Sequence, residues 1–516
     1  MVYGVIVGTT LLGCFLLYAW GGFSINYLNY FFISPVWSTG VIFDNCSLLI
    51  LLMLLICFGF VRSYTHHYFG GGEAPEYLLL LICAFVGVMG VLVFTGDPLL
   101  TLVFWEYLGV VSFFLILFYL SYLSLRASVI TLVSSRFGDV CLFFVICLTC
   151  YLHPEYNLLC LCLFLVVCTK SASFPFISWL LEAMRAPTPV SSLVHSSTLV
   201  AAGVWFTLRY GVAEGWAESS YLFIFLIVTV LITGMASFFF LDLKKIVALS
   251  TCNNINWCII YLLLGGFWLS LFQLVCHGVS KCLLFMLVGD VMSGSGGSQA
   301  GNYSYSPIFY GSCGSFGLVC IILGLSGVPF IGVFFTKHFM LGSVLGVCNI
   351  FLGSCIFFGA LLSYLYSFRL CRMLISSRIS APIGVMFTCA ALSSTYWWLF
   401  LNFFVSSTLD EHIAGGMAVA TVVMMFQVFA GWACWAIYSS VVMTTWCSSL
   451  FGVDSLAEVV YHWYQKLGFI VRSCLFRWDN YCLGLCPNKL TWISLRTINP
   501  IFCMLLLFLV IIFLLI

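Results

Sequence analysis

Long apolar runs recur along this chain, and short polar segments separate them. A bilayer core requires about 20 apolar residues of helix, and a scan at that length predicts about 15 membrane spans. The pattern therefore predicts an all-α, polytopic transmembrane helix bundle. The expected spans cover approximately residues 3–19, 45–61, 77–95, 99–120, 129–151, 157–180, 188–212, 221–241, 246–264, 266–289, 309–345 (broken), 349–368, 382–405, 414–443 and 498–516.

One segment near the C-terminus has a different pattern. Residues 447–490 mix charged and aromatic residues with apolar ones, and the apolar positions recur at helical spacing. This spacing is typical of an amphipathic helix that lies along a membrane surface or against partner proteins. The apolar positions are Leu456, Val459, Val460, Trp463, Leu467 and Ile470.

The distribution of Lys and Arg among the loops provides a test of the predicted number of spans. Most of them follow even-numbered spans, on the side of the N-terminus, and Arg209 is the main exception. The positive-inside rule therefore places the N-terminus on the matrix or cytoplasmic side. The first run, residues 3–19, has no basic leading segment and is interpreted as a membrane helix and not as a cleaved signal.

Composition supports a membrane protein and excludes other classes. The chain is 63% hydrophobic and 7% charged, whereas a soluble protein carries roughly a quarter charged residues. The net charge of +1 gives no basic face for nucleic acid. Most of the 26 cysteines lie in apolar runs, and Cys147 and Cys150 have no converging ligands, so no metal or redox site is predicted.

A few ionisable residues lie inside the predicted spans. A charge at mid-bilayer costs at least about 2.5–3.5 kcal/mol, so each of these groups requires a facing partner or water. We take them as the candidate functional residues of the chain. They are Glu106, Arg136, Asp139, Lys170, His195, His277, Lys281 and Lys337.

The spacing of two pairs is informative. Arg136 and Asp139 share one helical face and can neutralise each other, either as a structural ion pair or as part of a site. His277 and Lys281 also share a face, which favours a proton path over a histidine that serves only packing.

Two of the lysines stand near prolines. Pro175 follows Lys170 and Pro329 precedes Lys337, so each helix should break near its lysine. Broken helices at membrane depth occur inside protein or beside water-filled cavities. Burial disfavours the charged ammonium and a carboxylate favours it, so such a lysine can load and release a proton. Glu106 is the expected counter-charge of Lys170, and a purely structural ion pair is the alternative.

The two broken, lysine-bearing segments also suggest an internal repeat. Residues 99–212 and 246–368 are the candidate pair, and an odd number of spans in each would make the repeats inverted. The expected organisation is an N-terminal helical region (1–94), a first repeat (95–245), a second repeat (246–376), further spans (377–446), the amphipathic helix (447–497) and a last span (498–516).

Several motifs together resemble the antiporter-like core of the NADH–ubiquinone oxidoreductase chain 5 family. The resemblance is good over residues 95–375. The motifs are FWEYLG (104–109), SRFGD (135–139), TKSASFPFISWLLEAMRAPTPVSSLVHSSTLVAAG (169–203), DLKKIVALST (242–251), HGVSKCLLFMLVGD (277–290) and GVPFIGVFFTKH (327–338).

The resemblance implies a membrane-arm subunit of respiratory complex I, part of the proton-translocating NADH:ubiquinone reductase of the mitochondrial inner membrane. It implies that this chain binds no cofactor, with NADH, FMN, iron–sulfur clusters and ubiquinone in partner subunits. It further implies that its partners are other membrane-arm subunits, especially the neighbouring antiporter-like subunit, together with lipids and protons. It also implies a lateral chain of protonatable groups from Glu106 and Lys170 through His195, His277 and Lys281 to Lys337. The segments 447–490 and 498–516 resemble the family's surface (lateral) helix and final span.

The sequence departs from the family in places and leaves two other functions open. Gln273 stands where the family usually has a histidine, FISW replaces a histidine-bearing segment, and the N-terminus is one span short. A cation/proton antiporter subunit of the multisubunit type shares the same motifs. A membrane scaffold with ion pairs only for packing is the third possibility.

Overall fold

The computed structural model describes residues 23–28, 38–151, 156–211, 220–301, 305–307, 311–328, 333–347, 350–375, 378–380, 416–436 and 441–485. The predicted spans at 3–19, 382–405 and 498–516 lie outside these residues. The chain divides into two units, Met1–Val453 and Asp454–Ile516, and each is described by itself.

The first unit is built mainly from apolar α-helices. Among the described residues, eight helices are long and apolar enough to cross a membrane, and four shorter apolar helices accompany them. This confirms a polytopic helical membrane protein, while the total of about 15 spans stays a prediction. The helices are α2 (Asn45–Phe69), α3 (Ala74–Phe94), α4 (Pro98–Leu117), α5 (Tyr122–Tyr151), α6 (Tyr156–Ser171), α7 (Ser178–Glu182), α8 (Thr188–Leu193), α9 (Leu199–Arg209), α11 (Ser220–Phe239), α12 (Leu243–Leu263), α13 (Phe267–Gly294), α14 (Gly311–Ser326), α15 (Phe334–Val347), α16 (Ile350–Ile375), α18 (Gly416–Ala436) and α19 (Val441–Ser448).

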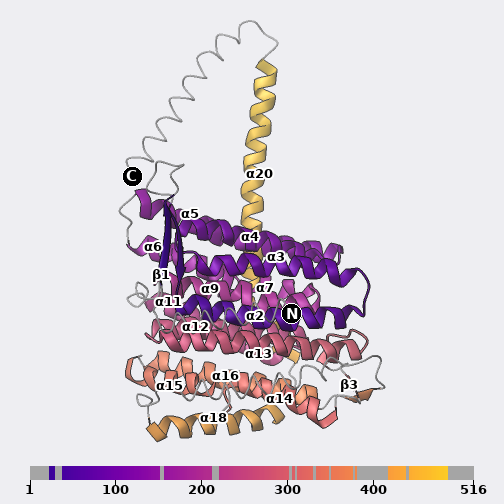
Figure 1. The fold of residues 1–516 in the computed structure, drawn as a ribbon. Helices are drawn as coiled ribbons and strands as arrows, with labels where there is room; N and C mark the ends of the chain where they lie inside the picture. The colour runs from indigo at the N-terminus through magenta and orange to yellow at the C-terminus, as the bar shows by residue number, and fades with distance from the viewer. Residues whose placement is uncertain are drawn as a thin grey trace. The chain divides into compact units, whose positions relative to one another are not determined.

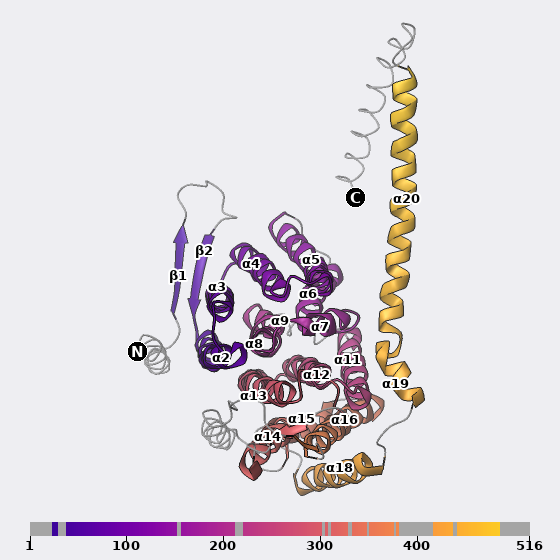
Figure 2. The same cartoon turned by 90° about the vertical axis from the view of Figure 1, so that its right-hand side faces the viewer.

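Helices of the first unit run side by side (Figure 1). Figure 2 shows that α3, α4 and α5 lie on one side of α8 and α9, whereas α12, α13 and then α14 to α16 lie on the other. The most buried spans are therefore the central ones: in the most apolar 18-residue stretch of Thr188–Arg209 every residue is buried, and in that of α12 94% of the residues are buried. Polar side chains on these central helices are shielded from lipid by the helices around them.

Local sequence sets several helix ends. Asp44 precedes α2 and exchanges capping hydrogen bonds with Ser47, and Gly70 ends the helix in the left-handed conformation at φ 65°. Prolines occupy the first turn of α3, α4 and α8, where the absent N–H has no intrahelical partner to lose.

Both predicted helix breaks are present. Helix α6 ends at Ser171, directly after Lys170, and α7 begins at Ser178. Helix α14 ends at Ser326, Gly327 follows with φ 84°, and α15 begins at Phe334. Pro329 and Gly332 lie outside the described residues. A further irregularity, a π-helical turn η2 (Val194–Thr198), joins α8 to α9 and was not predicted.

Two contacts between helix ends agree with the predicted topology, in which successive spans cross the membrane in opposite directions. Arg209, at the end of α9, pairs with Asp44 before α2 at 2.5 Å, and His67 near the end of α2 lies 3.5 Å from Asp290 near the end of α13. The predicted topology places each pair on one side of the membrane. Arg209, the exception among the loop charges, is thus neutralised by a carboxylate.

Short strands occur in what was expected to be an all-α chain. Strands β1 (Phe23–Leu28) and β2 (Ser38–Phe43) form an antiparallel hairpin, and β3 (Tyr305–Pro307) pairs in parallel with β4 (Arg378–Ser380). The apolar runs here are too short to span a bilayer, and residues 20–44 were left without an assigned element.

The short 3-10 turn η6 (Leu450–Gly452) belongs to the first unit, and helix α20 (Val453–Leu485) follows it in the sequence. Residues 454–485 of this helix are the described part of the second unit. Its apolar side chains are exposed, with Trp463 at 68% and Leu467 at 58%. The predicted amphipathic helix over this region is confirmed.

Candidate functional site

Lys170 is fully buried in the first unit, at the C-terminal end of α6. Its ammonium lies 3.5 Å from the main-chain oxygen of Trp105 and 5.1 Å from the centre of the Trp105 ring. The break after Ser171 exposes main-chain oxygens that a continuous helix would use, and an aromatic face also attracts a cation. The Lys170 ammonium therefore has two uncharged partners, the main-chain oxygen and the ring of Trp105, which stabilise its charge only weakly.

Asp139 is the carboxylate that interacts electrostatically with the Lys170 ammonium. Its side chain is buried on α5, and Lys170 and Arg136 are the charges that act on it. Arg136 also forms an ion pair with Glu106 of α4 through the same nitrogen, Nη1, that lies 3.9 Å from Asp139. In the structure Glu106 therefore forms an ion pair with Arg136, whereas the sequence analysis expected Glu106 to be the counter-charge of Lys170.

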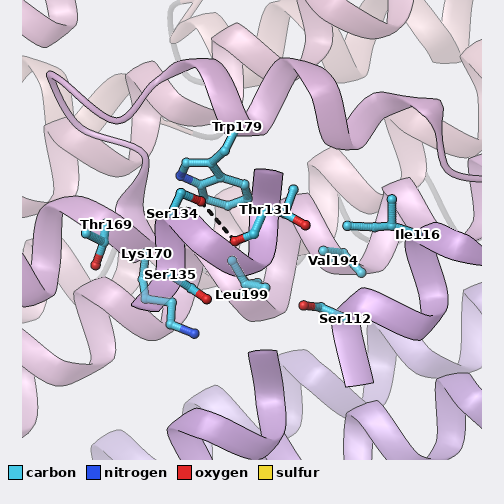
Figure 3. Close-up of a pocket in the computed structure, with 10 residues that line it drawn as sticks. All are labelled: Ser112, Ile116, Thr131, Ser134, Ser135, Thr169, Lys170, Trp179, Val194 and Leu199. Atoms are coloured by element: carbon cyan, nitrogen blue, oxygen red, sulfur yellow. Dashed lines mark hydrogen bonds between the residues drawn. The ribbon is translucent and has the colours of Figure 1, made fainter. Parts of the chain in front are cut away.

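A water-sized cavity opens beside Lys170 (Figure 3). Hydroxyl groups from three helices face it, and Lys170 extends along one side. Such a polar space can hold a water molecule that receives a proton from an ammonium or returns one. The polar lining residues are Ser112, Thr131, Ser134, Ser135, Thr169 and Lys170.

Close helix packing fixes this arrangement. A Cβ atom on Gly138 would lie 2.1 Å from Oγ1 of Thr169, and one on Gly203 would lie 3.1 Å from the main-chain nitrogen of Ser171. Helices α5 and α9 can therefore approach α6 at the level of Lys170 only because glycine stands at both positions.

We expect Gly138→Ala to push α5 away from α6 and to destabilise the subunit by about 1–3 kcal/mol, the usual cost of overpacking. The displaced Asp139 would also weaken its interaction with Lys170. Gly87→Ala on α3 is the matched control, because nothing lies within 4 Å of the added Cβ. Thermal unfolding of the purified assembly measures the difference, and equal unfolding temperatures for the two variants would contradict the packing argument.

Sequence reasoning missed a polar connection from the first break to α12. Ser171 and Ser173 share a hydrogen bond of 2.7 Å, and the Ser173 hydroxyl donates to Oδ1 of Asn256 at 2.6 Å. The signal was available: TCNNIN (251–256) places three asparagines in an apolar span. Asn253, Asn254 and Asn256 are all buried.

Lys281 lies on the other side of α12. Its ammonium donates to the Ser250 hydroxyl, and both residues line a second water-sized cavity together with Asn254. Ser326, at the second helix break, lines the same cavity. Helix α12 therefore presents polar groups to the Lys170 break through Asn256 and to Lys281 through Ser250.

Lys337 repeats features of Lys170 in the second half. It is buried, and its ammonium donates to the main-chain oxygen of Ser326 at 2.6 Å and to the Ser363 hydroxyl at 2.7 Å. The Tyr364 ring lies 4.9 Å away. Among the described residues no carboxylate forms an ion pair with Lys337 or Lys281.

Two histidines, His195 and His277, are buried in the same part of the bundle as the lysines. His195 is fully buried in η2 with its ring centre 6.3 Å from that of Trp179, which borders the cavity of Lys170. Both ring nitrogens of His277 lack a hydrogen-bond partner among the described residues. Gln273 accepts a hydrogen bond of 2.9 Å from Thr336, the neighbour of Lys337, so it joins α13 to α15 without titrating.

The geometry therefore joins the predicted residues into two groups. Glu106, Arg136, Asp139 and Lys170 form the first, between α4, α5 and α6. Lys281 and Lys337 form the second: Lys281 lines a cavity together with Ser326, and Lys337 donates to the main-chain oxygen of Ser326. Buried ammonium groups, hydroxyls and water-sized spaces can exchange protons.

Comparison with known proteins gives consistent results. The family described as NADH:quinone oxidoreductase/Mrp antiporter, transmembrane region, matches residues 95–363. The chain is 34% identical to NADH-ubiquinone oxidoreductase chain 5 of Anopheles gambiae over 350 residues, 64% of this chain and 60% of the relative. The corresponding protein of Mytilus edulis is 34% identical over 331 residues, 60% of this chain and 57% of the relative. The match thus spans about 60% of the length of such relatives.

Solved structures share the fold. A chain of the Mrp complex from a Dietzia species superposes with a TM-score of 0.75 at 19% identity, covering 97% of this chain and 59% of that one. A chain of respiratory complex I from Thermus thermophilus with bound NADH gives 0.64 at 17% identity, covering 83% and 93%. The architecture is therefore that of antiporter-like membrane subunits.

Proposed function

The chain belongs to the NADH:quinone oxidoreductase/Mrp antiporter family, and from this premise we propose that it is a proton-translocating subunit in the membrane arm of respiratory complex I. Its place would be the mitochondrial inner membrane, with the N-terminus on the matrix side. The redox centres and the quinone would belong to partner subunits, and this chain would contribute proton movement alone.

One observation carries the proposal. Three buried lysines, Lys170, Lys281 and Lys337, stand beside hydroxyl groups, and water-sized cavities adjoin the first two. Burying an ammonium without a carboxylate is costly in any membrane protein. Lys281 and Lys337 are in this position among the described residues, and Lys170 shares its carboxylate, Asp139, with Arg136. Burial of all three lysines is explained if each exchanges its proton in turn.

Arg136 offers a switch for the first lysine. Its Nη1 atom bonds to Glu106 and lies 3.9 Å from Asp139. If Glu106 becomes neutral or is drawn elsewhere, Arg136 can turn toward Asp139 and compensate that carboxylate. Asp139 then stabilises the Lys170 ammonium less, and Lys170 releases its proton into the cavity beside it.

From Lys170 the proton would pass toward Lys281 and Lys337. Hydroxyl and amide groups at Ser173 and Asn256 connect the first break to α12, and His195 borders the same region. The cavity between Lys281 and Ser326 leads to the second break. In this scheme the two halves act as inverted repeats, each with one broken, lysine-bearing helix.

Glu106 and Arg136 also indicate a partner. Their side chains are 32% and 45% exposed, and both lie near the middle of spans α4 and α5. Exposed apolar neighbours surround them, including Tyr107 at 55% and Phe137 at 58%. Because lipid cannot solvate such charges, we propose that a neighbouring membrane subunit covers this face and changes the charge near Glu106.

A cation/proton antiporter subunit of the multisubunit type is the alternative, since the family includes both. Co-purification distinguishes them. A tagged chain should isolate with flavin, iron–sulfur clusters and NADH-oxidising activity, and a photo-crosslinker at Tyr107 should capture a membrane subunit of that assembly. Isolation with a sodium- or proton-exchanging assembly that lacks flavin would instead support the alternative.

A further inference from the structure

A second acid–base cluster lies at the end of the bundle, away from the residues assigned so far. His67, with its side chain 27% exposed, stands 3.5 Å from the Asp290 carboxylate, which is only 2% exposed. Tyr64, on α2, directs its hydroxyl to Gly289 of α13, close to the side chains of Asp290 and of Thr188 on α8. A Cβ on Gly289 would meet that tyrosine oxygen at 2.4 Å, so the fit is tight.

Thr188 begins a polar face that leads inward. Along α8 and η2 the residues three, four and seven positions after it are Ser191, Ser192 and His195, which is the spacing of one helical face. All four side chains are buried. Helices α2, α8 and α13 pack against one another, so this face runs through protein and not along lipid.

We propose that His67 and Asp290 form a proton-uptake site on the basic-loop side of the membrane, which delivers protons along the polar face of α8 to His195. This inference rests on the proposed function. Other charged or titratable groups at this end include Tyr68 and the exposed Arg62 and His66 of α2, the exposed Glu76 in the first turn of α3, the Glu182–Arg185 pair before α8, and Lys244 of α12, whose ammonium donates to the main-chain oxygen of Ala186.

Each step moves one proton and leaves its carrier unchanged. His67 binds a proton from water on Nε2 and transfers it to the Asp290 carboxylate. The carboxylic acid then donates to the oxygen of Tyr64, which releases its own hydroxyl proton to Thr188. The serine hydroxyls pass the proton on in the same manner, and His195 accepts it on a ring nitrogen.

The chemistry of the pair distinguishes uptake from a structural tie between helix ends. This chain makes such a tie at the opposite ends of its spans with Asp44 and Arg209 at 2.5 Å. An arginine keeps its proton at any physiological pH, whereas an imidazole exchanges one near neutrality. The partly exposed partner of the buried carboxylate is, at this end, the residue that can exchange.

The test measures protons pumped per NADH oxidised in the reconstituted complex. Asp290→Asn should lower this ratio, and Thr188→Val should do so with Thr188→Ser restoring it. Glu76→Gln, an exposed carboxylate at the same end, is the matched control and should leave the ratio unchanged. Blue-native gels establish that equal amounts of complex assemble, and Asp290→Glu serves if the asparagine variant does not assemble.

The outcomes separate this inference from the proposed function. A normal ratio in Asp290→Asn or Asp290→Glu and in Thr188→Val, with a reduced ratio in Lys170→Met, overturns the uptake site and leaves the function standing. A normal ratio in all of them, Lys170→Met included, overturns both. A reduced ratio in Thr188→Val that serine does not restore also contradicts hydroxyl transfer.

Discussion

Replacing Lys170 with methionine should lower proton transfer through this subunit by roughly 10²–10⁴-fold, the contribution expected of a positioned acid–base group. Methionine fills a similar volume but carries no proton. Asp139 would keep Arg136 at 3.9 Å as a compensating charge, so assembly should be affected less than pumping. The ratio of protons pumped to NADH oxidised, measured in proteoliposomes, reports the loss.

Lys170→Arg is the sharper companion variant. Arginine preserves the positive charge and the contact with the Trp105 ring, but it does not release its proton. If the lysine acts only as a structural charge, the arginine variant should pump normally. If it exchanges a proton, arginine should fail as methionine does. Lys245→Met controls for the loss of a cation, because Lys245 is 38% exposed in a surface pair with Asp242.

The helix breaks were predictable because their cause is local. Proline lacks a backbone N–H donor and its ring clashes with the preceding helical turn, so Pro175 prevents α6 from continuing beyond Ser171. Helical spacing likewise predicted that Arg136 and Asp139 share a face, and they lie 3.9 Å apart. The amphipathic pattern after residue 453 predicted α20 for the same reason.

The partner of Lys170 could not be predicted in that way. Which carboxylate faces it depends on how α4 and α5 rotate against α6, and apolar helices with polar residues on several sides leave that rotation open. Glu106 was the obvious choice because it stands alone in its span. The close approach at Gly138 instead brings α5 and its Asp139 to the lysine.

Asp290 and His67 escaped sequence reasoning for a different reason. Charges are common at the ends of spans, where they meet water, so neither residue is unusual at its position. Only the packing of α2 against α13 shows that the Asp290 side chain is 2% exposed. Burial of a polar group at a helix end is a property of the tertiary structure.

The two lysines of the second half differ from Lys170 in their electrostatics. Lys170 has Asp139, whereas among the described residues Lys281 and Lys337 donate hydrogen bonds to serine oxygens and form no ion pair with a carboxylate. Hydroxyl and carbonyl dipoles stabilise an ammonium less than a full negative charge does. A proton should therefore leave these lysines more readily than it leaves Lys170. Transfer toward the second half then requires that Arg136 first compensates Asp139, so that Lys170 binds its proton less tightly.

Lys337→Met should separate proton transfer from structure. The substitution removes a buried charge that has no carboxylate partner, and Ser363 keeps a hydrogen bond to Ala360 at 2.6 Å. The subunit should therefore assemble as well as the wild type, or better, since desolvation of the ammonium no longer opposes folding. Proton transfer should fall by roughly 10²–10⁴-fold, as for Lys170.

A membrane scaffold that uses its charges only for packing predicts the reverse: Lys337→Met would reduce assembly, and whatever assembled would pump normally. Blue-native gels and proton-pumping ratios on the same preparation decide between these outcomes. Ser363→Ala is the matched control, because it removes one hydrogen bond from the ammonium at 2.7 Å but leaves the proton carrier in place. Its pumping should stay close to that of the wild type, whereas a loss equal to that of Lys337→Met would show that the position, and not the proton, matters.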